Sequence, residues 1–136
     1  MAILLDSGIL YALYDRRDAW HRAALELAQQ EKGGLVVPTP VIPEVDHLLG
    51  QRLGIEAQIL FYQALLERHY ILAGLPPEGY LRDYELNRKY RNLELGFVDA
   101  AVLATAEILG LGRIATTDRK DFGLVRANIP IELLPS

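Results

Sequence analysis

Cysteine is absent from this sequence of 136 residues, and methionine and tryptophan each occur only once. Without cysteine, a disulfide framework and every metal site built from thiolate ligands are excluded. Long apolar runs are missing as well, because no stretch approaches the ~18 residues that a membrane-spanning helix requires, and no basic and apolar leader opens the chain. We therefore expect a cytoplasmic protein with no membrane partner.

Positive charge is also in short supply, since 14 Lys and Arg stand against 18 Asp and Glu, a formal net charge of −4. This balance argues against a broad basic surface that binds nucleic acid through phosphate contacts alone. It still allows nucleic-acid binding, because a few carboxylates gathered at one metal site would account for the whole excess. The composition is 51% hydrophobic and 24% charged, which, with this length, predicts one globular domain spanning residues 1–136.

Short apolar segments alternate with helical patterns along the chain. Strands are predicted at 2–5, 35–38, 69–75, 113–117 and near 130–135, and helices after residue 7 and at 18–32, 39–53, 55–68, 77–90 and 96–110. Asp18 and Thr39 stand where N-caps are expected, and Pro130 favours an edge position for the last strand. This alternation is typical of an α/β protein whose parallel sheet is covered by helices on both faces.

Four acidic residues fall where such a sheet would bring them together. Asp6 directly follows the first strand and Asp118 the fourth, while Glu44 and Asp99 lie near the beginnings of two helices. In an open parallel sheet, ligands bind beyond the carboxyl ends of the strands. We therefore expect these four carboxylates to converge at one end of the sheet.

Each acid also has a local explanation. Asp6 can cap the following helix, Asp118 can form a turn, and Glu44 suits the first turn of a helix. Asp99 is harder to explain locally, because it lies in an apolar helix where an isolated charge is costly to bury. Four converging carboxylates repel one another unless a cation binds, and oxygen ligands without cysteine suit Mg²⁺ or Mn²⁺, ions that often act on phosphates.

The motifs around these acids resemble one protein family. LLDS ends at Ser7, PEVDHLL contains Glu44, GFVDAAVLATA contains Asp99, and ATTDRKDF contains Asp118. Together with DAWHRAA at 18–24, this set resembles the PIN-domain ribonucleases, in particular the small VapC-type toxins of prokaryotic toxin–antitoxin pairs. The resemblance extends over almost the whole chain.

The resemblance implies a three-layer αβα PIN-like fold with a five-stranded parallel sheet of order 3-2-1-4-5. It also implies a metal-dependent endoribonuclease that hydrolyses RNA with Mg²⁺ or Mn²⁺. Asp6, Glu44, Asp99 and Asp118 match the four acids of the family's catalytic site. On this hypothesis Asp6, Asp99 and Asp118 ligate the metal, whereas Glu44 acts through water or activates the nucleophile.

Further residues of the family pattern are interpreted as supporting ones. Ser7 matches a small hydroxyl residue beside the first acid, and Asp121 matches a less constant acid that we interpret first as a turn residue and second as a ligand. Members often carry another Asp near position 92, where this chain has Asn92. Candidate contacts to RNA phosphates, each with a solvated surface charge as the alternative, are Arg16, Arg17, Arg119 and Lys120.

The resemblance also predicts protein partners. A toxin of this kind binds a cognate antitoxin, and family members are commonly homodimers, for which the apolar, tyrosine-bearing segments 59–72 and 80–90 are candidate interfaces. Two alternatives stay open at the level of sequence. One is a catalytically silent PIN-like interaction module, and the other is a PIN nuclease of RNA processing that has no antitoxin.

Overall fold

The computed structural model describes all residues 1–136 and contains one five-stranded sheet in which every neighbouring pair of strands is parallel. The strand order is β3-β2-β1-β4-β5, which confirms the predicted order. The strands are β1 (Ile3–Leu5), β2 (Leu35–Pro38), β3 (Ile71–Ala73), β4 (Arg113–Ala115) and β5 (Glu132–Leu134). Leu4 of the central strand lies opposite both Val36 and Ile114, so β1 is paired on both sides.

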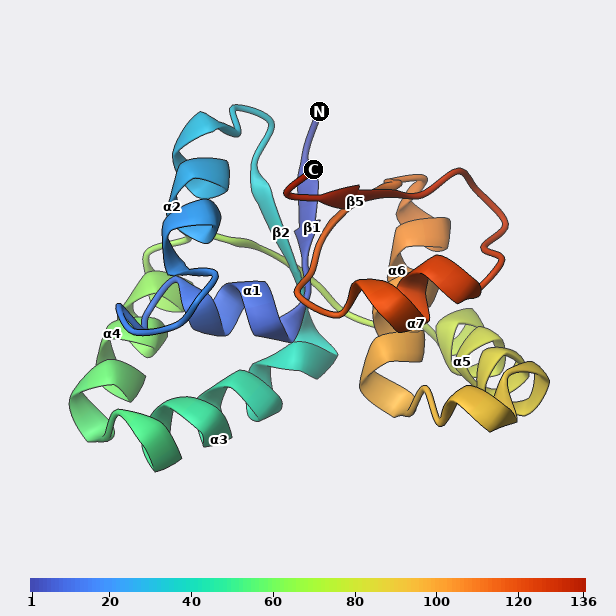
Figure 1. The fold of residues 1–136 in the computed structure, drawn as a ribbon, viewed down its shortest axis with the longest axis horizontal. Coiled ribbons are helices and arrows are strands. Elements are labelled where there is room, and N and C mark those ends of the chain that lie inside the picture. The colour runs from blue at the N-terminus through green and yellow to red at the C-terminus, as the bar shows by residue number, and fades with distance from the viewer.

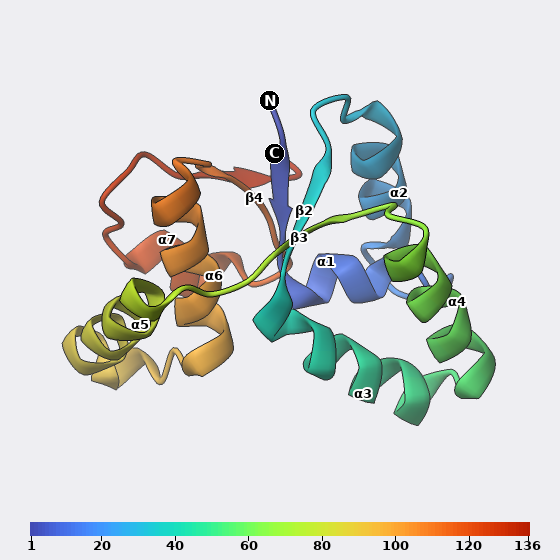
Figure 2. The ribbon, with the colours of Figure 1, turned by 180° about the vertical axis from the view of Figure 1, so that it is seen from behind.

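Seven α-helices and two short 3₁₀ turns connect the strands. They are α1 (Ser7–Ala12), α2 (His21–Gln30), η1 (Thr39–Val41), α3 (Ile42–Arg52), α4 (Ile55–Leu66), α5 (Pro77–Lys89), η2 (Arg91–Leu93), α6 (Phe97–Leu109) and α7 (Arg119–Leu124). Helices α1 to α4 gather on one side of the central strands β1 and β2, and α5 to α7 gather on the other (Figures 1 and 2). No helix is both long enough and apolar enough to cross a bilayer.

The core lies where the central strands meet α1 and α6. All three residues of β1 are buried, and in α6 seven consecutive residues, Ala100 to Ala106, are buried. Four of these seven are alanines, and small side chains let a helix approach its neighbours closely on more than one side. Gly110 ends α6 in the left-handed conformation with φ 63°, a geometry that glycine adopts without steric cost.

Two helices begin later than predicted, and one helix was not predicted. Helix α2 begins at His21, and the Asp18 carboxylate accepts a hydrogen bond from the Trp20 N–H at 2.8 Å, so Asp18 stabilises the turn before the helix. Thr39 opens the 3₁₀ turn η1, and α3 begins three residues later with Val41 as its N-cap. Helix α7 lies where only a turn was predicted. The helix was missed because a segment of six residues that contains a glycine shows little helical periodicity.

The carboxyl ends of the strands and the beginnings of several helices lie at the same end of the sheet. The chain passes from β1 into α1, from β2 through η1 into α3, and from β4 towards α7 at this end. Met1 lies at the amino end of β1, away from this region (Figure 1), whereas Ser136 follows the carboxyl end of β5. The carboxyl ends of the central strands and the beginnings of three helices therefore face the same region.

Candidate functional site

A cavity of about 450 Å³ opens at this end of the sheet. Its lining includes all four acids singled out in the sequence, namely Asp6, Glu44, Asp99 and Asp118, together with Ser7. No lysine, arginine or histidine is among its 12 lining residues. The cavity is thus strongly acidic, and the carboxylates meet no side-chain cation there.

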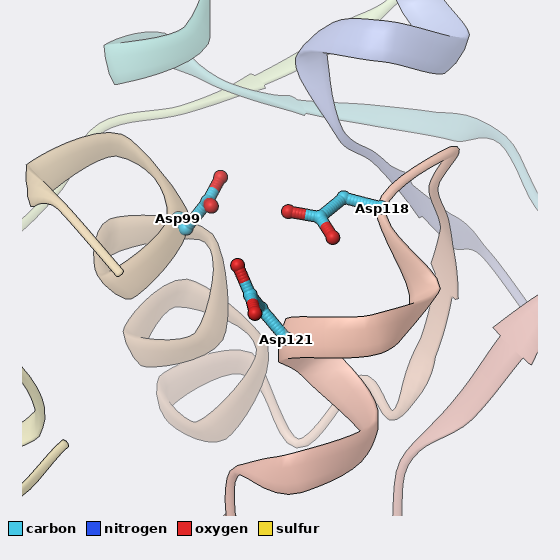
Figure 3. A group of neighbouring side chains, drawn as sticks. All are labelled: Asp99, Asp118 and Asp121. Atoms are coloured by element: carbon cyan, nitrogen blue, oxygen red, sulfur yellow. The ribbon is translucent and has the colours of Figure 1, made fainter. Parts of the chain in front are cut away.

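Three of the carboxylates in this region approach one another most closely. Asp99 lies in the first turn of α6, Asp118 directly precedes α7, and Asp121 lies in the first turn of α7. One oxygen from each carboxylate lies within 4.8 Å of the others, and the three side chains point towards one another in Figure 3. Asp121 was interpreted from sequence first as a turn residue, and the structure places it in a helix with its carboxylate in this group.

Asp6 is held more tightly and more deeply than the other acids. Its side chain is 3% exposed; Oδ1 accepts a hydrogen bond from the Ser7 N–H at 2.8 Å, and Oδ2 accepts one from the Thr116 hydroxyl at 2.8 Å. Asp6 is also the N-cap of α1, so the capping role and a place in the cavity coexist. Burial raises the pKa of the Asp6 carboxyl, although both hydrogen bonds oppose that shift.

Two hydroxyl groups connect the acids. The Ser7 hydroxyl donates to Oε1 of Glu44 and so joins the beginning of α1 to the first turn of α3. Thr116, which is fully buried, donates to Asp6 and accepts from the Asp118 N–H at 2.9 Å. The sequence analysis did not single out Thr116. Its only signal in the sequence is the pair of threonines, Thr116 and Thr117, between the end of β4 and Asp118.

Gathering these groups has an electrostatic cost at Asp99. Burial, followed by the negative charges of Asp6, Asp118, Glu44 and Asp121, raises the pKa of the Asp99 carboxyl to about 7. A carboxyl with this pKa ionises far less readily than one in water. A cation among these acids would remove the repulsion and favour the ionised form.

An asparagine clamp fixes the beginning of α6. Asn87 of α5 accepts a hydrogen bond from the Gly96 N–H at 2.9 Å and donates to the Gly96 carbonyl at 3.3 Å. Gly96 has φ 86°, a conformation that disfavours other residues. Asn87 also donates to buried Asp83 at 3.0 Å. The backbone that carries Asp99 is therefore tied to α5, a link that the sequence pattern did not indicate.

The predicted phosphate-binding cations lie in different surroundings. Arg16 and Arg17 are exposed in the segment between α1 and α2, and Lys120 is exposed beside Asp118. The guanidinium of Arg119 lies 5.6 Å from the centre of the Trp20 ring, and its Nε and Nη2 atoms are buried. Arg119 therefore packs against Trp20, the N-cap residue of α2, whereas the other three side chains are open to solvent.

The sequence matches the model of a known protein family. The family model described as PIN domain matches residues 3–127. The chain belongs to the PIN-domain family. This PIN domain is 27% identical over 124 residues to Ribonuclease VapC26 of Mycobacterium tuberculosis, which covers 91% of the present chain and 92% of that protein.

Solved structures show the same fold. VapC20 of Mycobacterium tuberculosis, described as a sarcin-ricin loop cleaving toxin, superposes with a TM-score of 0.80 at 22% identity, covering 90% of this PIN domain and 96% of that chain. VapBC2 of Rickettsia felis, solved bound to a DNA fragment from its promoter, gives a TM-score of 0.72 at 16% identity and covers 98% of both chains. A toxin–antitoxin complex of Klebsiella pneumoniae gives a TM-score of 0.71 at 22% identity, covering 90% of this PIN domain and 92% of that chain.

Proposed function

We propose that this PIN domain is a metal-dependent endoribonuclease and the toxin of a toxin–antitoxin pair. The observation that carries the proposal is the meeting of Asp99, Asp118 and Asp121 within 4.8 Å, in a region that Asp6 and Glu44 also reach. The relatives support it, since one is called a ribonuclease and another a toxin that cleaves the sarcin-ricin loop.

The residues present fit a hard divalent cation. Every side chain that faces the centre of the group offers carboxylate oxygen, which suits Mg²⁺ or Mn²⁺. We assign the metal-holding role to Asp99 and Asp118, with Asp121 completing the close group and Asp6 contributing from the buried side. When bound, such an ion supplies electrophilic stabilisation of a phosphodiester and lowers the pKa of water.

The remaining polar residues of the cavity have positioning roles. Ser7 holds one oxygen of Glu44, which leaves the other free to accept a proton from the attacking water. Thr116 fixes Asp6 and the Asp118 backbone relative to each other. Water attacks phosphorus and gives its proton to Glu44, while the bond to the 3′ oxygen breaks and that oxygen takes a proton from solvent. The products carry a 5′-phosphate and a 3′-hydroxyl. Arg16, Arg17 and Lys120 are the exposed cations that we assign to RNA phosphates.

Metal supply should control both activity and stability. We expect a mixed RNA pool to be cleaved with Mg²⁺ or Mn²⁺ and left intact with EDTA. Because an ion that binds only the folded state stabilises it, saturating metal should raise the melting temperature by about 5–10 °C. A Glu56→Gln variant, which removes an exposed acid of α4 outside the cavity, serves as the control and should respond as the wild type. Equal cleavage with EDTA and with metal would contradict the proposal.

An antitoxin is the protein partner that we propose. Several similar structures are toxin–antitoxin complexes, including those of Rickettsia felis and Klebsiella pneumoniae. A basic side chain of the antitoxin would compensate the unpaired carboxylates of the cavity. Co-expression with the cognate antitoxin should abolish RNA cleavage, and undiminished cleavage by the isolated complex would exclude inhibition of this site.

We also propose a homodimer, and favour the first of the two predicted segments as its interface. Segment 59–72 exposes large apolar side chains on α4 and β3, which would be covered in a dimer: Ile59, Leu60, Tyr62, Leu66, Ile71 and Leu72. Leu66 is 81% exposed. A monomer in sedimentation at micromolar concentration would contradict this assignment.

A further inference from the structure

Two exposed aromatic rings lie at the rim of the acidic cavity. Phe97 is one of the cavity's lining residues, and its ring stacks on that of Tyr80 with a centroid distance of 6.1 Å and an interplanar angle of 28°. Stacking does not bury the pair, since Phe97 is 48% and Tyr80 57% exposed. Large aromatic rings that are exposed to solvent beside a site differ from core residues, because part of each ring surface is free to contact a ligand.

The position of the pair relative to the acids is fixed by the backbone. Phe97 is the first residue of α6 and stands two residues before Asp99. The Asn87 side chain holds Gly96, directly before Phe97, against α5, the helix that carries Tyr80. A ligand group stacked on these rings would therefore lie at a defined place beside the carboxylates.

A row of side chains continues from the pair along α5. Tyr80, Tyr84 and Arg88 are spaced by four residues and so share one side of the helix. Tyr84 is 58% exposed, and its hydroxyl accepts a hydrogen bond from Arg88 Nη1 at 3.0 Å. Beyond them a surface hollow of about 660 Å³ is lined by Arg88, Lys89 and Arg91, with Glu85 as its only acid.

We infer that Phe97 and Tyr80 form a stacking platform for an unpaired base of an RNA strand whose phosphate enters the acidic cavity. This inference rests on the proposed nuclease function and adds the residues that select single-stranded substrate. Aromatic faces accept any base and contribute most when the base is not paired. The strand continues over Tyr84 towards Arg88 and Arg91, where cations meet its phosphates.

The charges on α5 favour a nucleic acid over a second copy of the chain. In a two-fold symmetric dimer the same surface occurs on both partners. The cations of the hollow, Arg88, Lys89 and Arg91, would then lie close to the same cations of the partner, and Glu85 is the only acid of the hollow that could offset their repulsion. A polyanion satisfies these cations instead. We therefore assign the second predicted interface segment, 80–90, to RNA.

The test compares Tyr80→Leu, which keeps apolar bulk but removes the ring, with Tyr80→Phe, which keeps the ring. Leu109→Ala, at the exposed far end of α6, is the control. Binding is measured with Mn²⁺ in a Glu44→Gln background, which removes the proposed proton acceptor and keeps the proposed metal-holding acids. The ligands are a single-stranded oligoribonucleotide of about 12 nucleotides that carries the fluorescent base 2-aminopurine, and a blunt duplex of the same sequence. Cleavage of the single strand is measured in the otherwise unchanged chain.

Tyr80→Leu should weaken single-strand binding and lower kcat/KM about tenfold, because stacking of one base accounts for an effect of this order. Fluorescence quenching of the stacked base should disappear with it. Tyr80→Phe and Leu109→Ala should stay within about twofold of the parent, and duplex binding should change by less than about twofold. Unchanged single-strand binding in Tyr80→Leu, or an equal loss for the duplex, would overturn the platform.

The same measurements separate this inference from the proposed function. Binding of single strands that depends on Tyr80, without cleavage of any RNA in the presence of metal, would support the platform and refute the nuclease. Metal-dependent cleavage with no dependence on Tyr80 would support the nuclease and refute the platform.

Discussion

The Asp99→Asn variant is expected to lose metal-dependent RNA cleavage by about a thousandfold or more. Asp99 belongs to the close group with Asp118 and Asp121, and an amide oxygen carries no charge to hold a divalent ion. Since a bound metal supplies several kcal/mol of transition-state stabilisation, losing its ligand removes an effect of this size. Cleavage of labelled RNA under single-turnover conditions measures the loss. Activity within about tenfold of the wild type would remove Asp99 from the metal site.

The folding stability of this variant provides the control. The pKa of Asp99 is raised to about 7 from an ordinary value of 3.8, so the folded protein binds its proton more tightly than the unfolded chain does. The resulting stability is present below about pH 4 and is lost as the pH rises to about 7. Asparagine never ionises. Without metal, Asp99→Asn should therefore melt higher than the wild type at pH 8, and this advantage should shrink towards pH 5. A variant that melts lower at pH 8 would reveal misfolding.

Leu103→Ala is expected to produce the largest loss of stability, about 2–5 kcal/mol in the free energy of unfolding. Leu103 is 1% exposed in the middle of α6, one turn beyond Asp99. Truncation removes buried apolar surface and leaves a cavity that a rigid helix cannot close. Because α6 carries Asp99, cleavage should fall as well. Urea unfolding measures the change.

Leu109→Ala on the same helix is the matched control. Leu109 is 50% exposed, and its truncation should alter the free energy of unfolding by about 0.5 kcal/mol or less. Equal losses in the two variants would mean that burial in α6 does not determine its stability. A loss of stability in Leu103→Ala without any loss of cleavage would mean that Asp99 is held by the Asn87 clamp rather than by packing beneath the helix.

The parallel α/β architecture followed from sequence because buried parallel strands leave continuous apolar segments and each is followed by a helix pattern. The strand order came from the resemblance to the PIN-domain family. The convergence of Asp6, Glu44, Asp99 and Asp118 followed from the same topology, since each comes just after a strand or near the beginning of a helix. Their cavity confirms that geometric expectation; their roles in catalysis stay a prediction.

The remaining features depend on contacts between distant residues. The place of Asp121 required α7, a helix of six residues that is too short to leave a periodic pattern. Thr116 reaches Asp6 across 110 positions of sequence, and Asn87 reaches Gly96 through the packing of α5 on α6. Such hydrogen bonds form only in the assembled fold, and local sequence propensities do not predict them.

The place of the N-terminus at the amino end of β1, opposite the acids (Figure 1), has a practical consequence for handling the protein. A fluorescent label, affinity handle or surface linker joined at Met1 would extend away from the cavity. Immobilisation through this end would thus present the carboxylates and the aromatic platform outward to a dissolved strand, whereas Ser136 follows β5 at the carboxyl ends of the strands and is the less suitable attachment point.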